Sequence, residues 1–344
     1  MKSQKYRSYI ESKILLLSFV CLVCSQVRVQ AQQSKSVLSV EEVKALIPQI
    51  EAAERSLLNI EIESEAWVET KTNLSDPCDP WQRTPIYISS TAWFDGLPNS
   101  KARFDVHKEV LEWQEGAAPY IEQSYSIGFD GHHGRLAKHT FGHSGETHDI
   151  KTGKVLADAP EALRTGWSNA FTGGRFSVYF FFNNDREFSS LSQFVRKITS
   201  PDLVKLNTFE FTLEAFQGVQ SIKIDSTFDR QIARMSIWLD PSHGFALRGY
   251  ELINIHEDGS EWLVSRITVT KLKEVSAGVW WPIEAYAEAG PSRPGKSYRR
   301  FVYRAYNVVA NNPNFDEKTF TVAFPDGYLI DDKVRGIKYR VGQE

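Results

Sequence analysis

The chain has 344 residues, of which 42% are hydrophobic and 24% are charged, and its formal net charge at pH 7 is −3. A chain of this length and hydrophobic content can bury a sizeable core of its own. Its slightly acidic balance excludes a protein that binds nucleic acid, or docks on anionic lipid, through a general positive field. We therefore expect no nucleic-acid partner.

The first 31 residues have the order of a secretory signal peptide. A basic region precedes an apolar run over residues 14–24, and Val29-Gln30-Ala31 then supplies the small residues that a signal peptidase reads. An apolar run of this length is too short to span a bilayer, which takes about 20 residues. We expect cleavage after Ala31 and a periplasmic or secreted protein.

Cleavage at this point leaves residues 32–344, which we expect to form one domain. This mature chain has 35 basic and 42 acidic side chains, hence a net charge of −7. No later stretch is apolar enough for a transmembrane segment. Cys78 is its single cysteine, so an intramolecular disulfide is excluded.

Helical signals are few. Ser39 followed by Glu42 is a capping box that opens a short helix, and Pro48 is expected to kink or restart it. Two further helices are predicted, over residues 160–171 and 188–198, where apolar residues recur at helical spacing. These helices are expected to cover one face or the mouth of a sheet.

Alternation of apolar and polar residues dominates the rest of the chain. Over residues 58–69 it predicts a strand with one dry and one wet face, with Trp67 opposite Ile60. The other predicted strands are 84–93, 102–109, 120–129, 135–140, 178–182, 209–216, 219–224, 233–239, 245–256, 262–272, 280–287, 297–309, 319–324 and 337–341. The fold class is therefore mainly β: one large curved antiparallel sheet or unclosed β-barrel with a few covering helices.

Five of the eight histidines lie within residues 132–148, close to several carboxylates. Imidazole and carboxylate groups suit zinc, and His133, His139 and His143 are the candidate metal ligands. The surrounding glycines favour solvated loop histidines instead, and no His-Glu-x-x-His spacing occurs. We predict no metal and no other cofactor, and keep a metal-assisted hydrolase as an alternative.

The second chemical feature is an aromatic run. Residues 176–182 are apolar on both faces of a strand, which is typical of a core strand or of the wall of a cavity. The residues that we expect to line such a ligand cavity are Phe176, Val178, Phe180, Phe182, Trp238 and Trp281.

Several turns resemble those of one protein superfamily. They are Trp238-Leu239-Asp240-Pro241, Gly278-Val279-Trp280-Trp281-Pro282, Phe324-Pro325-Asp326-Gly327, Phe94-Asp95-Gly96 and Phe129-Asp130-Gly131. Together they resemble the LolA/LolB-like lipoprotein carriers, including uncharacterised members from planctomycete-type bacteria. The resemblance implies an unclosed β-barrel with an apolar cavity for acyl chains, and it brings no catalytic signature.

The sequence thus favours a non-catalytic exported protein that binds an apolar or amphipathic ligand in a curved-sheet cavity. Its partner would be a lipid or a lipoprotein. The alternatives are the hydrolase above and a scaffold or interaction module of the cell envelope. The carrier and the scaffold require the same apolar interior, so the sequence does not separate them.

Overall fold

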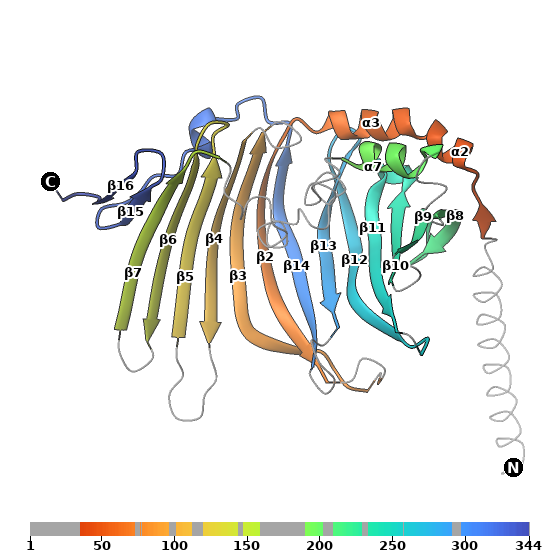
Figure 1. Cartoon of the computed structure of the whole chain (residues 1–344), viewed down its shortest axis with the longest axis horizontal. Coiled ribbons are helices and arrows are strands. Elements are labelled where there is room, and N and C mark those ends of the chain that lie inside the picture. The colour runs from red at the N-terminus through yellow and green to blue at the C-terminus, as the bar shows by residue number, and fades with distance from the viewer. Residues whose placement is uncertain are drawn as a thin grey trace, which may run out of the picture.

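The computed structural model describes residues 35–72, 76, 78–95, 101–111, 120–143, 147–158, 190–201, 209–228, 233–256, 258–290 and 297–343. Within these residues, 16 strands form one sheet whose two ends do not meet (Figure 1). All but one of the strand pairs are antiparallel, and three α-helices accompany the sheet. The predicted fold class, a large unclosed sheet with covering helices, is confirmed.

The sheet consists of two meanders joined side by side. The first meander contains β2 (Asn59–Lys71), β3 (Gln82–Asp95), β4 (Lys101–Leu111), β5 (Tyr120–Phe129), β6 (Gly134–His143) and β7 (Thr147–Leu156). The second contains β8 (Phe209–Phe216), β9 (Val219–Phe228), β10 (Ala233–Asp240), β11 (Ala246–Ile255), β12 (Glu261–Ser276), β13 (Val279–Ala289) and β14 (Tyr298–Ala310). Pairing of β14 with β2 joins the two meanders.

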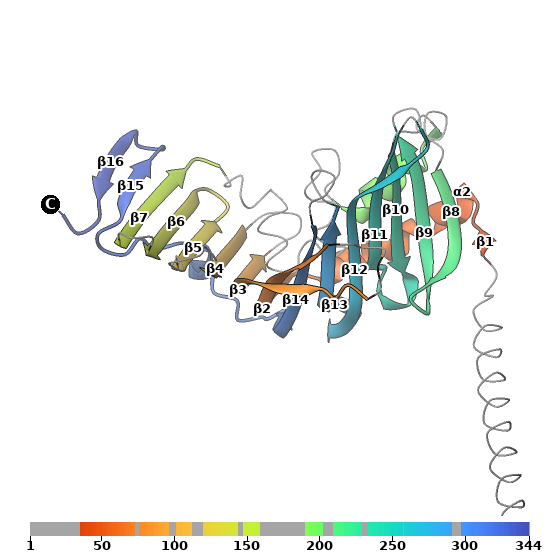
Figure 2. The ribbon, with the colours of Figure 1, turned by 90° about the horizontal axis from the view of Figure 1, so that it is seen from below.

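Short strands finish both edges of the sheet. The strand β1 (Ser36–Val37) pairs with β8 at one edge. At the other edge, β15 (Leu329–Asp332) pairs in parallel with β7, and β16 (Ile337–Arg340) pairs with β15. Figure 2 shows that the second meander curls strongly from β12 to β8, whereas β2 to β7 form a flatter, open layer.

The two faces of the sheet differ in character, as the alternation in β2 illustrates. Ile60, Ile62 and Ala66 are fully buried on one face, which we call the inner face. Trp67 lies on the opposite, outer face, where its indole N–H donates to Glu69 at 2.8 Å. The prediction that Trp67 faces away from Ile60 is therefore confirmed.

Three helices form a layer over the inner face of the second meander: α2 (Val40–Ala45), α3 (Ile47–Ser56) and α7 (Leu191–Ile198) (Figure 1). Ser39 and Glu42 form the predicted capping box, and α3 restarts with Pro48 in its first turn. The predicted helix 160–171 and strand 178–182 lie outside the described residues. No helix in the described part of the chain is long and apolar enough to cross a membrane.

Residues 314–343, which we call the C-terminal segment, first cross the outer face of β4 to β7 and then form β15 and β16 at the edge of the sheet. The predicted strand over residues 319–324 is wrong, because a 3-10 helix (Glu317–Phe320) and extended chain occupy this region. Phe320 and Val322 are nevertheless buried, as the alternation predicted. The segment packs across the strands of the first meander and does not pair with a neighbouring strand. Glycine makes this approach possible, because a Cβ atom on Gly128 would lie 2.5 Å from the carbonyl oxygen of Phe320.

The turn after β10 contains a buried carboxylate. The Asp240 side chain is inaccessible to solvent, and it accepts hydrogen bonds from Arg248 Nη2 at 2.7 Å and from the Ser242 amide at 3.0 Å. Burial alone would raise the pKa of Asp240, but the hydrogen bonds from Ser242 and Arg248 outweigh it and hold that pKa below its ordinary value. The charged form of Asp240 is therefore part of the folded structure.

We predict that Asp240→Asn lowers the free energy of unfolding at pH 7 by about 3–5 kcal/mol, because it leaves the mostly buried Arg248 without its charge partner. A lowered folded pKa stabilises the protein above the unfolded pKa of about 3.9, and this contribution disappears as the pH falls through the folded pKa. The difference between wild type and variant should therefore shrink below about pH 4. Urea unfolding of both proteins at pH 7, 5 and 3 measures this difference in the free energy of unfolding.

The matched control is Asp258→Asn. Asp240 accepts bonds from both the amide and the hydroxyl of Ser242, and Asp258 accepts the equivalent two bonds from Ser260 in an exposed turn, at 2.8 and 2.6 Å. Its loss should cost much less stability than that of Asp240, because no buried cation depends on it. If Asp240→Asn and Asp258→Asn lowered the free energy of unfolding equally, burial of the Asp240 carboxylate would not explain its contribution.

Candidate functional site

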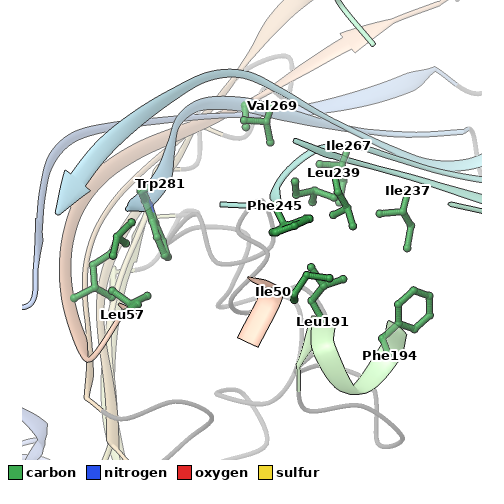
Figure 3. Close-up of a cluster of buried hydrophobic side chains, with 14 of the residues drawn as sticks. Ile50, Leu57, Leu191, Phe194, Ile237, Leu239, Phe245, Ile267, Val269 and Trp281 are labelled. Atoms are coloured by element: carbon green, nitrogen blue, oxygen red, sulfur yellow. The ribbon is translucent and has the colours of Figure 1, made fainter. Parts of the chain in front are cut away.

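The apolar inner face of the second meander lies directly beneath the helical layer (Figure 3). Alternate residues of β10 and β13 point inward, so that Ile237, Leu239 and Trp281 are fully buried. Ile50 of α3 and Leu191 of α7 belong to the same cluster. This cluster is therefore the contact between two layers that belong to distant parts of the sequence.

The helices of this layer are bound to each other by polar contacts. Glu54 of α3 accepts hydrogen bonds from the amide of Ser192 at 3.0 Å and from its hydroxyl at 2.5 Å. Glu51 forms an ion pair with Arg196 of α7, and this hydrogen bond lowers the pKa of Glu51. These bonds make α3 and α7 one unit.

At its C-terminal end, α3 is anchored beside the end of β14. The side-chain amide of Asn311 donates to the carbonyl oxygen of Ser56 at 2.7 Å, and its oxygen accepts from the amide of Leu58 at 2.7 Å. The rest of the contact between the helices and the sheet includes many apolar side chains. The layer is therefore attached to the sheet at two places: at Asn311 after α3, and before α2, where β1 pairs with β8 and the amide of Leu38 donates to the carbonyl oxygen of Phe211 at 2.8 Å.

Trp281 is one of the predicted cavity residues, and it lies in the core. Its side chain is 0% exposed, and its indole N–H lies 3.5 Å from the hydroxyl of Tyr303 on β14. Burial raises the pKa of Tyr303 far above its ordinary value. Trp281 thus packs at the join of the two meanders.

Trp238, also predicted to line the cavity, lies on the outer face. It stacks on Phe216 with ring centroids 4.6 Å apart and donates to Glu214 at 3.0 Å. Its neighbours Ile237 and Leu239 occupy the inward positions of β10, so Trp238 takes no part in an inner-face site. The other cavity candidates, Phe176, Val178, Phe180 and Phe182, lie outside the described residues.

A groove of about 420 Å³ lies on the outer face of the first meander. Its floor comes from β3 to β6, and one wall is the C-terminal segment; the opposite side carries Tyr306 of β14. Its lining residues are Ser89, Ser90, Thr91, Asp105, Val106, His107, Ser124, Tyr125, Ser126, Ala137, Tyr306, Ala323, Pro325 and Tyr328. The groove was not predicted from the sequence, although small hydroxyl residues alternate along β3 and β5.

Two charged or titratable groups lie in the floor of this groove. Arg103 donates to both oxygens of Asp105, at 3.0 and 2.8 Å. His107 lies with Nδ1 3.0 Å from the hydroxyl of Ser124 and with Nε2 3.3 Å from Glu109. The floor is therefore polar, with its carboxylate already paired.

The predicted histidine cluster is spread over the first meander. The backbone amide of His133 donates to Asp130 at 2.8 Å in the turn before β6, and His139 Nε2 lies 2.7 Å from Asp149. The side chain of His143 lies outside the described residues. Among the residues that the structure describes, no three His, Cys, Asp or Glu side chains are placed to hold a metal ion. Cys78 is an exposed free thiol.

We predict that changing His133, His139 and His143 together to alanine leaves the melting temperature almost unchanged. Surface substitutions usually alter the free energy of unfolding by no more than about 0.5 kcal/mol. Circular dichroism melting with and without a chelator measures this. A large fall in the triple variant, matched by the chelator acting on wild type, would instead indicate a structural metal.

Comparison with known proteins finds matches among solved structures. No protein-family model matches the chain, and no curated protein matches it. Among solved structures, it is similar to a domain from Vibrio parahaemolyticus described as an outer membrane lipoprotein-sorting protein domain. The two are 11% identical, with a TM-score of 0.34, over 82% of this chain and 97% of that chain. A likeness at this level carries no functional argument.

Proposed function

We propose that the protein is a non-catalytic carrier that holds an apolar or amphipathic ligand between the inner face of the second meander and the helical layer. One observation carries the proposal. The sheet is open, and its apolar inner face is covered by helices that are bound to each other and anchored near Ser56 and Asn311. Because α3 and α7 are joined by polar contacts while their contacts with the sheet include many apolar side chains, a ligand can enter beneath the layer between its two attachments without separating α3 from α7.

Burial of an acyl chain can balance the free energy that this exchange costs. Separating the helical layer from the sheet exposes apolar side chains at a cost of about 1.5–3 kcal/mol each. An acyl chain that replaces them gains about 0.8 kcal/mol for every methylene group that it buries. About twelve methylene groups therefore offset the exposure of roughly four core side chains. A lipid, or the acyl group of a lipoprotein, meets this requirement.

The location that we propose is the cell envelope, where such ligands occur. The signal-like order of residues 1–31 supports export. The turns that resemble the LolA/LolB-like carriers support the same function. The histidine-based hydrolase is not proposed, because the described histidine side chains contact carboxylates and a serine individually and share no centre.

The test is photolabelling of delipidated protein with a fatty acid that carries a diazirine group. We expect saturable labelling, competed by unlabelled fatty acid, on peptides of α3, α7, β10 and β13. Trp238→Ala is the control, because this residue lies on the outer face and its loss should leave labelling unchanged. Labelling confined to outer-face peptides, or none that saturates, would overturn the proposal.

A further inference from the structure

The groove on the outer face is separate from the proposed lipid site. It lies on the first meander, on the face opposite to the inner core, between Tyr306 and the C-terminal segment. Its volume of about 420 Å³ falls in the range of about 300–1,000 Å³ that small-molecule sites occupy. A ligand bound here would contact neither the helical layer nor the inner face.

The floor of the groove is a regular grid of polar side chains. One row across the strands contains Thr91, Asp105 and Ser126, which are paired neighbours on β3, β4 and β5. The next row contains Ser89 and His107, followed by Ser124. Strand spacing places groups in a row about 4.8 Å apart, and the two rows about 7 Å apart. This grid can serve several hydroxyl groups of a single flat ligand.

Three of these hydroxyls have no partner in the described part of the chain. Ser124 is bonded to His107, whereas Ser89, Thr91 and Ser126 make no side-chain hydrogen bond with another described residue. A hydroxyl both donates and accepts, so these groups suit a ligand that does the same. They are also exposed to the groove and need no rearrangement to bind.

The aromatic ring of Tyr306 lies beside the polar floor of the groove. The pairing of β14 with β2 shifts register between Ala305 and Asn307, and Tyr306 occupies this irregularity. Its side chain is 64% exposed, although it is large and aromatic. Across the groove, Tyr328 and Pro325 form the opposite wall. A ring with an apolar face and a polar edge can stack between such walls and the floor.

The charges around the groove favour a neutral ligand. Asp105 is already paired with Arg103, so neither group is free to bind an ion. Burial, and then the charges of the nearby Glu63 and Glu65, raise the pKa of Tyr306. An anionic group placed beside the Tyr306 ring would therefore approach these two carboxylates.

We infer that the groove binds a neutral carbohydrate. One sugar ring would stack its C–H face on Tyr306, and its hydroxyl groups would bond to Ser89, Thr91 and Ser126. Among ligands of this size, a sugar combines neutral charge, many hydroxyl groups and an apolar ring face.

The test uses an array of neutral oligosaccharides, followed by isothermal titration calorimetry with the best of cellotriose, maltotriose, chitotriose and the array hits. We expect saturable 1:1 binding. Tyr306→Ala should weaken it at least about tenfold, because the sugar ring loses the aromatic face on which it stacks. Tyr306→Phe should retain most of it, since the ring remains. Tyr339→Ala, an exposed tyrosine on β16, is the matched control.

Inorganic phosphate and spermidine are tested in parallel as anionic and cationic probes. No saturable binding across the neutral array, preferred binding of either ion, or unaltered binding by Tyr306→Ala would overturn the inference. Fatty-acid labelling of Tyr306→Ala should stay at the wild-type level. The outcome for the groove is therefore independent of the outcome for the lipid site.

Discussion

Removal of residues 319–344 is expected to prevent folding to a soluble monomer. Phe320, Val322, Tyr328 and Ile330 are buried against the outer face of the first meander. Burial of these four side chains contributes about 6–12 kcal/mol, at about 1.5–3 kcal/mol each, and the truncated chain loses this contribution. The whole stability of a domain is about 5–15 kcal/mol, so this loss is comparable to the total. Expression in the soluble fraction and sedimentation velocity measure the result.

Point variants in the C-terminal segment test whether its buried side chains, and not only its presence, stabilise the fold. The double variant Phe320→Ala and Val322→Ala removes two buried side chains, and should lower the urea midpoint strongly. Its matched control, Ile337→Ala and Tyr339→Ala, removes two exposed side chains of β16 and should leave the midpoint nearly unchanged. A truncated chain that stays monomeric with the wild-type midpoint would show that the segment is a free tail.

Trp281→Ala is expected to lower the free energy of unfolding by about 3–5 kcal/mol. The indole is fully buried where β13 meets the inner core, so its removal leaves a cavity and takes a partner from the buried hydroxyl of Tyr303. The neighbouring Trp280 is half-buried on the other face of β13, where its ring meets His243 edge-on at 4.2 Å.

Trp280→Ala therefore serves as the matched control, with an expected loss of about 1 kcal/mol. Urea unfolding followed by far-ultraviolet circular dichroism gives both values without relying on tryptophan fluorescence. Equal losses would mean that the inner face at Trp281 is loosely packed, and that the helical layer already leaves space there.

Most of the fold could be predicted because each signal was local. The alternation in residues 58–69 and the capping box at Ser39 depend only on nearby residues, and both appear in the structure. The strand β7 was missed because Thr147–Leu156 contains polar residues on both faces and a glycine at Gly153. Its outer face is covered by Phe324 and Ile330, which follow about 170 residues later, so no local pattern identifies it.

The outer groove could not be predicted for the same reason. Ser89, Ser126, Tyr306 and Tyr328 come together only through the pairing of β14 with β2 and the crossing of the C-terminal segment. Alternation in β10 likewise places Trp238 and Ile237 on opposite faces, but it does not state which face is covered. The position of Trp238 on the outer face therefore could not be predicted from the sequence.

The join between β14 and β2 also sets an order for folding. Each meander pairs strands that are adjacent in the sequence, whereas the contact between Leu58 and Asn311 spans 253 residues. Closing a flexible loop of that length costs about 5 kcal/mol of free energy through lost chain entropy, and only contacts across the join offset this cost. The two meanders should thus form first, and their union should limit the rate. During synthesis, β2 remains an unpaired edge until the ribosome has passed β14.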